Sequence, residues 1–147
     1  MTSIGYRAFY ECSGLTSVTM PSSVTSISSG AFDGCNDLLF DTETVPGVKL
    51  VDGWAVGVSG TLSGHWELLG VRGIANCAFG GCKELSSVTI YEGMTSISGG
   101  AFQYCSGLTN ENGIRKIILF FSRLASRADL LHLADILPVA GRVLRRA

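Results

Sequence analysis

Ile4-Gly-Tyr-Arg-Ala8-Phe9-Tyr-Glu-Cys12-Ser-Gly-Leu15 opens a pattern that returns along the chain at a fixed period. Each clear copy starts at an isoleucine and then carries Ala, Phe, Cys and Leu at constant offsets; the copies begin at Ile4, Ile27, Ile74 and Ile97. Ile4 and Ile27 are 23 residues apart, as are Ile74 and Ile97. Such a period is typical of a solenoid, in which each unit buries its apolar face against its neighbours.

A disguised unit fills the gap between Ile27 and Ile74. With Val51 as its anchor, Ala55 falls at the expected Ala position, while Val56 and Ser59 stand where Phe and Cys are expected. We therefore predict about five units and call them units 1 to 5, in chain order.

Within a unit, the sequence predicts a strand, an extended piece and a tight turn. Apolar and β-branched residues alternate over 15–20 and again over 85–90. A second extended segment, 24–27, is followed by Gly and Ser, which turn the chain into 31–35, where we predict one turn of helix. The fold class predicted is a β-rich solenoid.

The complete motif is Leu15-x-x-Val18-x-Met20-Pro21-x-x-Val24-x-x-Ile27-x-x-x-Ala31-Phe32-x-x-Cys35, with equivalents in unit 4. It resembles the BspA-like, or treponemal-type, leucine-rich repeats over residues 1–109. The resemblance implies a stack of 23-residue coils. It also implies a cell-surface or secreted protein of the kind found in bacteria and some protists, which binds other proteins or host surfaces.

The repeat stops after Leu108, and residues 110–147 form an atypical tail that is basic and apolar. Ser126 is a candidate N-cap for a helix that ends near Pro138. Three interpretations remain open: a helical cap over the last unit, a reading-frame artefact, and a segment that touches a membrane surface. The apolar run 117–121 is too short for a transmembrane span.

No secretory signal is visible at the start, where Met1 falls inside a unit. We therefore expect the chain to be a fragment of a longer protein, or the product of a gene whose start has been lost.

Charge is distributed unevenly along the chain. Residues 1–113 hold four Lys or Arg and ten Asp or Glu, a net charge of −6. The remaining residues hold seven basic and two acidic groups, a net charge of +5. An acidic repeat region disfavours a nucleic-acid partner, which requires a basic face.

Four cysteines occupy one repeat position, and two readings of them are open. The spacing permits disulfides between Cys12 and Cys35 or between Cys82 and Cys105. The alternative is a ladder, in which the equivalent side chains of successive units all point inward. A ladder favours buried free thiols at these four positions, with Cys77 partly exposed in a turn. We expect no metal site, because no Cys-x-x-Cys or paired His spacing occurs.

The sequence motifs do not support catalysis or cofactor binding. The chain has two histidines and contains no Gly-x-Ser-x-Gly elbow, phosphate loop or dinucleotide fingerprint. Cys77 with His65 is a weak candidate for a nucleophile and base, because nothing brings them together. We expect a protein that is not an enzyme and uses no cofactor.

A polar strand face is the candidate binding surface. In 64–68, Trp66 and Leu68 are out of step by one residue with Val88 and Ile90, and a β-bulge would restore their inward phase. His65 and Glu67 would then face outward near unit 4. The candidate face comprises Ser17, Thr19, His65, Glu67, Ser87, Thr89 and Tyr91. The alternative is that Trp66 is ordinary core and His65 an ordinary surface residue.

The function predicted is a non-catalytic binding module for a protein or glycan partner. The alternatives are a structural spacer, and a truncated fragment of a larger surface protein with no activity of its own.

The ladder predicts that Phe32 and Phe79 are buried between units. Replacing Phe32 with Ala removes a buried ring and should lower the free energy of unfolding by about 3–5 kcal/mol. A thermal melt of F32A that matches the original protein would show that the ladder assignment is wrong.

Overall fold

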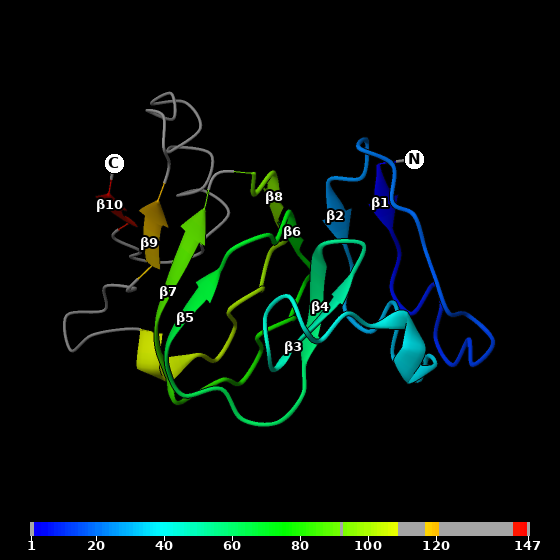
Figure 1. The fold of residues 1–147 in the computed structure, drawn as a ribbon, viewed down its shortest axis with the longest axis horizontal. Coiled ribbons are helices and arrows are strands. Elements are labelled where there is room, and N and C mark those ends of the chain that lie inside the picture. Colours follow the sequence, from blue (N-terminus) through cyan, green and yellow to red (C-terminus); the bar gives the residue numbers. More distant parts are fainter. Residues whose placement is uncertain (1, 92, 109–116, 121–142, 147) are drawn as a thin grey trace.

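The computed structural model describes residues 2–91, 93–108, 117–120 and 143–146. These residues form short strands and turns (Figure 1), with two single-turn 3-10 helices, η1 (Asp37–Leu39) and η2 (Ser106–Leu108). No α-helix occurs among them. The predicted β-rich repeat fold is confirmed for this part of the chain.

The isoleucine anchors pair as the period requires. Strand β1 (Ser3–Ile4) lies parallel to β2 (Ser26–Ile27), with Ile4 opposite Ile27. Strand β6 (Gly73–Ile74) lies parallel to β8 (Ser96–Ile97), with Ile74 opposite Ile97. All four isoleucines are buried. Residues 23 positions apart are therefore structural neighbours in units 1 and 2 and in units 4 and 5.

The phenylalanines that follow the anchors in the sequence stack in the same two pairs. The ring centroids of Phe9 and Phe32 are 5.2 Å apart, and those of Phe79 and Phe102 are 5.1 Å apart. Their interplanar angles are 6° and 11°. Phe32 and Phe79 are buried, as predicted.

The cysteine ladder also faces inward, with all five cysteines present as free thiols. Cys35, Cys82 and Cys105 are buried, Cys12 is half-buried and Cys77 is exposed. The Cys35 thiol donates to the Phe9 carbonyl oxygen at 3.1 Å, and the Cys105 thiol donates to that of Phe79 at 2.9 Å. Burial raises the pKa of Cys35 and of Cys82, which keeps these groups in the unreactive thiol form.

Each turn needs two residues in the left-handed region, three and seven positions after the anchor. The residues found there are Arg7 and Glu11, Gly30 and Gly34, Cys77 and Gly81, and Gly100 and Tyr104, with φ between 53° and 76°. Four of these eight are not glycine, and each such residue is disfavoured there by a contact of its Cβ. The turns of units 1, 4 and 5 therefore carry backbone strain.

Unit 3 differs from the prediction. Val51 does not anchor a coil; it ends β3 (Val48–Val51), which forms an antiparallel hairpin with β4 (Trp54–Val58). Asp52 and Gly53 turn the chain with φ of 45° and 81°, as a type I′ turn requires. Ala55, rather than Val51, lies opposite Ile74.

Trp54 is buried at the start of β4. It lies opposite Gly73, and a Cβ on Gly73 would come within 2.5 Å of the indole ring. The glycine therefore lets the indole lie across β6. The Trp54 indole N–H finds no hydrogen-bond partner among the described residues.

The edge of β6 joins the two halves of the protein. The Ala75 N–H donates to the Ala55 carbonyl oxygen, and the Asn76 N–H donates to the Ile27 carbonyl oxygen, both at 2.8 Å. The hairpin and unit 2 thus both pack on unit 4.

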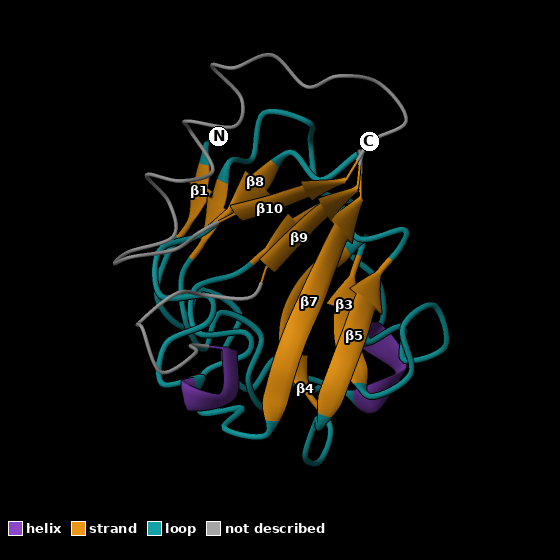
Figure 2. Ribbon diagram, turned by 90° about the vertical axis from the view of Figure 1, so that its left-hand side faces the viewer, coloured by secondary structure: helices purple, strands orange, loops and turns teal. Residues whose placement is uncertain are grey.

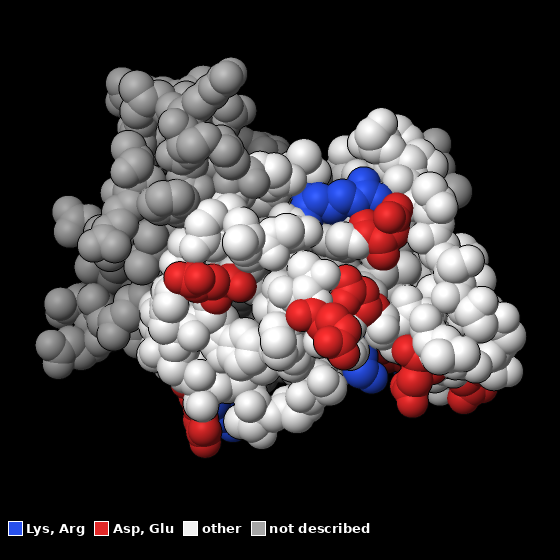
Figure 3. Space-filling model, viewed as in Figure 1, with Lys and Arg blue, Asp and Glu red and all other residues white. Residues whose placement is uncertain are grey.

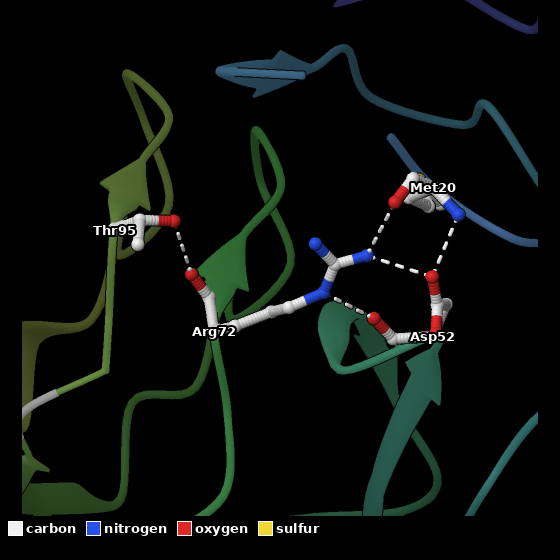
Figure 4. Close-up of polar contacts among 4 residues, drawn as sticks. All are labelled: Met20, Asp52, Arg72 and Thr95. Carbon is white, nitrogen blue, oxygen red and sulfur yellow. Dashed lines mark hydrogen bonds and ion pairs between the residues drawn. The ribbon is translucent and has the colours of Figure 1, made fainter. Parts of the chain in front are cut away.

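A polar clamp reinforces this junction (Figure 4). Arg72 Nη2 lies 2.7 Å from Asp52 Oδ2 and donates to the Met20 carbonyl oxygen at 3.0 Å. Asp52 Oδ2 also accepts from the Met20 N–H at 2.6 Å. Thr2, Thr25 and Thr95 occupy the repeat position of Arg72. The arginine therefore replaces a threonine where unit 4 meets the hairpin instead of a regular unit.

Besides the pair β1-β2, the described residues form two four-stranded sheets: β3-β4-β6-β8, and a sheet on the other side of the stack (Figure 2). Its strand order is β10-β9-β7-β5, with every neighbouring pair parallel. Strands β5 (Gly64–Leu68) and β7 (Leu85–Tyr91) come from units 3 and 4. The predicted bulge is confirmed: the register shifts between Gly64 and His65, so that Trp66 and Leu68 face Val88 and Ile90.

The tail supplies the rest of this sheet. β9 (Ile117–Phe120) pairs with β7, and β10 (Val143–Arg146) pairs with β9. The tail was predicted to be helical, which is wrong for these eight residues. The helix predicted from Ser126 lies outside the described residues. The boundary predicted at residues 109 and 110 also falls there.

The strand predicted over 15–20 does not form, whereas its counterpart β7 does. A strand needs a paired neighbour, and unit 2 does not provide one. Its matching segment instead forms η1 and a bridge from Asp41 to Leu50 of the hairpin. The hairpin therefore draws the strand of unit 2 away from unit 1.

Two substitutions in the strained turns are expected to change the stability of the protein in opposite directions. Tyr104 is 74% exposed at φ 60°, so Tyr104→Gly relieves strain and should stabilise the protein by up to about 1 kcal/mol. In Gly34→Ala the new Cβ lies 2.8 Å from Glu11 Cγ at φ 73°, so the variant should lose about 1–2 kcal/mol.

Urea unfolding measures both effects. Gly14→Ala is the matched control, because Gly14 has no atom within 4 Å of a new Cβ. If G34A and G14A unfold at the same urea concentration, the left-handed assignment of the turn does not hold.

Candidate functional site

The outer face of β5 and β7 brings together five of the seven predicted face residues. The bulge pairs His65 with Ser87 and Glu67 with Thr89 across the two strands. Side chains alternate between the faces of a strand. Trp66 and Leu68 therefore point inward, while His65 and Glu67 are exposed. Trp66 is only half-buried, and its indole N–H donates to the Ser63 carbonyl oxygen at 3.1 Å.

His65 bridges two hydroxyl groups of the neighbouring strand. Its Nδ1 lies 2.5 Å from Ser87 Oγ, and its Nε2 lies 3.1 Å from Thr89 Oγ1. Because a hydroxyl group can donate or accept, this arrangement suits either neutral tautomer of the ring. Both ring nitrogens are engaged, which fixes the orientation of the imidazole on the sheet.

Glu67 and Tyr91 form a second pair along the same face. Partial burial raises the pKa of Tyr91, and the nearby Glu67 carboxylate raises it further through its charge and a hydrogen bond. The phenol therefore stays protonated well into the alkaline range. The two pairs make a continuous polar strip, His65–Ser87–Thr89 and Glu67–Tyr91, which we call the β5–β7 strip.

Two predicted face residues lie outside this strip. Ser17 and Thr19 are exposed, but they belong to the irregular segment that precedes Met20. Thr89 is within the strip yet only 7% exposed, because β5 and β9 flank it. Thr89 therefore offers little exposed surface, although its hydroxyl group contacts His65 on the predicted face.

The Ser87–His65 contact has the geometry of a nucleophile and its base. However, the second nitrogen of His65 faces the Thr89 hydroxyl group, which cannot stabilise an imidazolium as a carboxylate does. The Glu67 carboxylate, on the same face, is engaged with Tyr91. The arrangement therefore holds fixed polar groups on the surface of the sheet.

Metal binding, surface charge and membrane spanning are the other properties of the described residues that bear on function. Among the described residues, no cluster of three or more His, Cys, Asp or Glu could hold a metal ion. On the face drawn in Figure 3, acidic side chains lie scattered and basic ones are fewer. No helix of the described residues is long and apolar enough to cross a membrane.

Sequence reasoning missed the hairpin, the Arg72 clamp and a pocket beside the hairpin. One signal was available: Asp-Gly between two apolar pairs is the strongest short-range mark of a two-residue hairpin. It stands at Asp52-Gly53. Counting a 23-residue period through this stretch assigned these residues to a coil.

The Glu67–Tyr91 pair predicts a selective change in titration. In Glu67→Gln the carboxylate charge is lost, so the pKa of Tyr91 should fall toward its ordinary value, with the burial contribution remaining. NMR titration of the four tyrosines measures this directly. Tyr6, Tyr10 and Tyr104 serve as internal controls, and an unchanged Tyr91 curve would contradict the pairing.

Comparison with known families supports the repeat fold. The model of the BspA-type leucine-rich repeat region, which describes six copies, matches residues 1–43 and 68–119. The unmatched stretch contains the hairpin. Neither the curated proteins nor the solved structures yielded a match. Because the matched residues make up more than half of the chain, the protein belongs to the BspA-type leucine-rich repeat family.

Proposed function

We propose that the chain is a short solenoid that serves as a non-catalytic protein-interaction module, with the β5–β7 strip as its binding face. The observation that carries the proposal is the fixed geometry of this strip. His65 is held at both ring nitrogens, and Glu67 is paired with Tyr91. Groups held in place before binding lose little conformational entropy when a partner docks.

Binding fits these residues better than catalysis does. A flat strip of His, Glu and Tyr on parallel strands offers hydrogen-bond donors, acceptors and an aromatic ring to a partner surface. Tyrosine is among the residues enriched at the energetic centres of interfaces. The strip has no orienting carboxylate on His65, which a nucleophile–base pair requires for turnover.

The partner proposed is a protein or a glycan, and the location proposed is the cell surface or outside the cell. The acidic repeat region supports this choice over a nucleic acid, because phosphate backbones would be repelled. The BspA-type family assignment supports a repeat protein that binds a partner.

The test measures binding by biolayer interferometry to a defined panel of immobilised oligosaccharides and purified extracellular proteins. The double variant His65→Ala, Glu67→Ala removes the two exposed side chains of the strip. The protein should bind at least one panel member, and the double variant should bind it at least tenfold more weakly.

Glu43→Ala is the matched control, since Glu43 is an exposed carboxylate that does not belong to the strip. It should bind like the original protein. If the original protein binds no panel member, or if the double variant binds equally well, the strip is not the binding face. The chain then fits a structural spacer better.

A further inference from the structure

A pocket of about 260 Å³ lies between the turn of unit 2 and the hairpin. Phe32, Gly34 and Cys35 line it from unit 2, and Val56, Gly57 and Val58 line it from β4. It is smaller than the sites of about 300–1,000 Å³ that hold drug-sized ligands. Its size suits one side chain with a short stretch of backbone.

The pocket occurs where the phenylalanine ladder is interrupted. Phe32 stacks on Phe9, and Phe79 stacks on Phe102, so the rings form two separate pairs. Unit 3 has no phenylalanine at its ladder position. The small residues of β4 line the space beside Phe32 instead. An aromatic ring therefore suits this position by size and chemistry.

Two backbone N–H groups of unit 2 face the pocket, as comparison with the other units indicates. In unit 1, the N–H groups of Phe9 and Glu11 donate to the carbonyl oxygens of Ala31 and Asp33 in unit 2, at 2.8 and 2.7 Å. In unit 4, the N–H groups of Phe79 and Gly81 donate likewise to Ala101 and Gln103 in unit 5, at 2.9 and 2.8 Å.

The equivalent groups of unit 2 are the N–H groups of Phe32 and Gly34. Among the described residues, neither donates to any acceptor. Since each turn directs these two donors toward the following unit, those of unit 2 point toward the hairpin and the pocket. Phe32 as a residue is 2% exposed, and Gly34 is exposed at the pocket. An unpaired buried donor is costly, which favours a ligand that accepts from it.

The acceptor is a neutral carbonyl rather than an anion. Asp33 and Asp37 line the pocket, and their carboxylates would repel a phosphate or sulfate. The one basic residue of the pocket, Lys49, has its ammonium group 5.0 Å from the centre of the Phe40 ring. A peptide supplies carbonyl oxygens at the spacing of two residues, as the turns of units 2 and 5 do.

We propose that this pocket binds a peptide segment of a partner protein. Its aromatic side chain packs beside Phe32, and its backbone carbonyl oxygens accept from the Phe32 and Gly34 N–H groups. The segment takes the place of the turn that unit 3 lacks. This site lies on different elements from the β5–β7 strip, so either one can fail without the other.

The test titrates the ¹⁵N-labelled protein with a capped peptide of residues 98–104, Ser-Gly-Gly-Ala-Phe-Gln-Tyr, which carries the turn of unit 5. The amide signals of Phe32 and Gly34 should move downfield on binding, while those of Phe9 and Glu11 stay in place. The same peptide with Ala in place of Phe102 should bind at least tenfold more weakly.

Two protein variants localise the effect. Val56→Trp fills the pocket from β4 and should weaken peptide binding at least tenfold. Leu69→Trp adds the same side chain at a residue that is 62% exposed and outside the pocket, and should bind normally. The peptide comparison does not depend on these variants, so it decides the question even if V56W unfolds.

Three results would overturn the proposal. The first is that the Phe32 and Gly34 amides do not move at a saturating concentration of the peptide. The second is that inorganic phosphate moves them instead, which would indicate an anion site. The third is that raising the concentration of the protein alone moves them, which would identify a second copy of the chain as the occupant.

Discussion

The hydrogen bond from a turn N–H of one unit to a turn carbonyl of the next is the interaction on which this fold depends. It fixes the spacing of Phe9 and Phe32 and of Phe79 and Phe102, because stacked rings follow a stacked backbone. It also requires the two left-handed residues in each turn, which aim the N–H groups along the stack. Every unit that donates these bonds needs a following unit to accept them.

The hairpin β3–β4 interrupts that chain of dependence. It replaces a turn-bearing unit, so the donors of unit 2 lose their acceptors, while β6 takes both the hairpin and unit 2 along one edge. The Arg72–Asp52–Met20 clamp then holds the hairpin between the halves. Exposed ion pairs alone contribute only about 0.2–1 kcal/mol. Here the guanidinium also satisfies the backbone carbonyl oxygens of Met20 and Asp52.

The regular part of the fold could be predicted from the sequence because it is periodic. The isoleucine pairing, the buried phenylalanines and the bulge before His65 all follow from residue spacing and inward phase. The contacts among His65, Ser87 and Thr89 follow from that bulge. These features depend on the register between neighbouring units, which the residue spacing of a single sequence determines.

The irregular part could not be derived in the same way. Ala55, not Val51, lies opposite Ile74, because the chain reverses in a two-residue turn at Asp52-Gly53 instead of continuing as an extended coil. The loss of a strand near Ser17 followed from this, since its neighbour in unit 2 was drawn to the hairpin. The pairing of β9 with β7 depends on tertiary contact and has no repeat signal. The pocket is visible only once the hairpin is in place.

Amide hydrogen exchange at equivalent turn positions can show whether a hairpin replaces the turn of unit 3. We expect slow exchange at Phe9, Glu11, Phe79 and Gly81, whose N–H groups are bonded to the next unit. We expect exchange at least tenfold faster at Phe32 and Gly34. Equal protection at all six positions would mean that a third turn stacks on unit 2 and that the hairpin does not replace it.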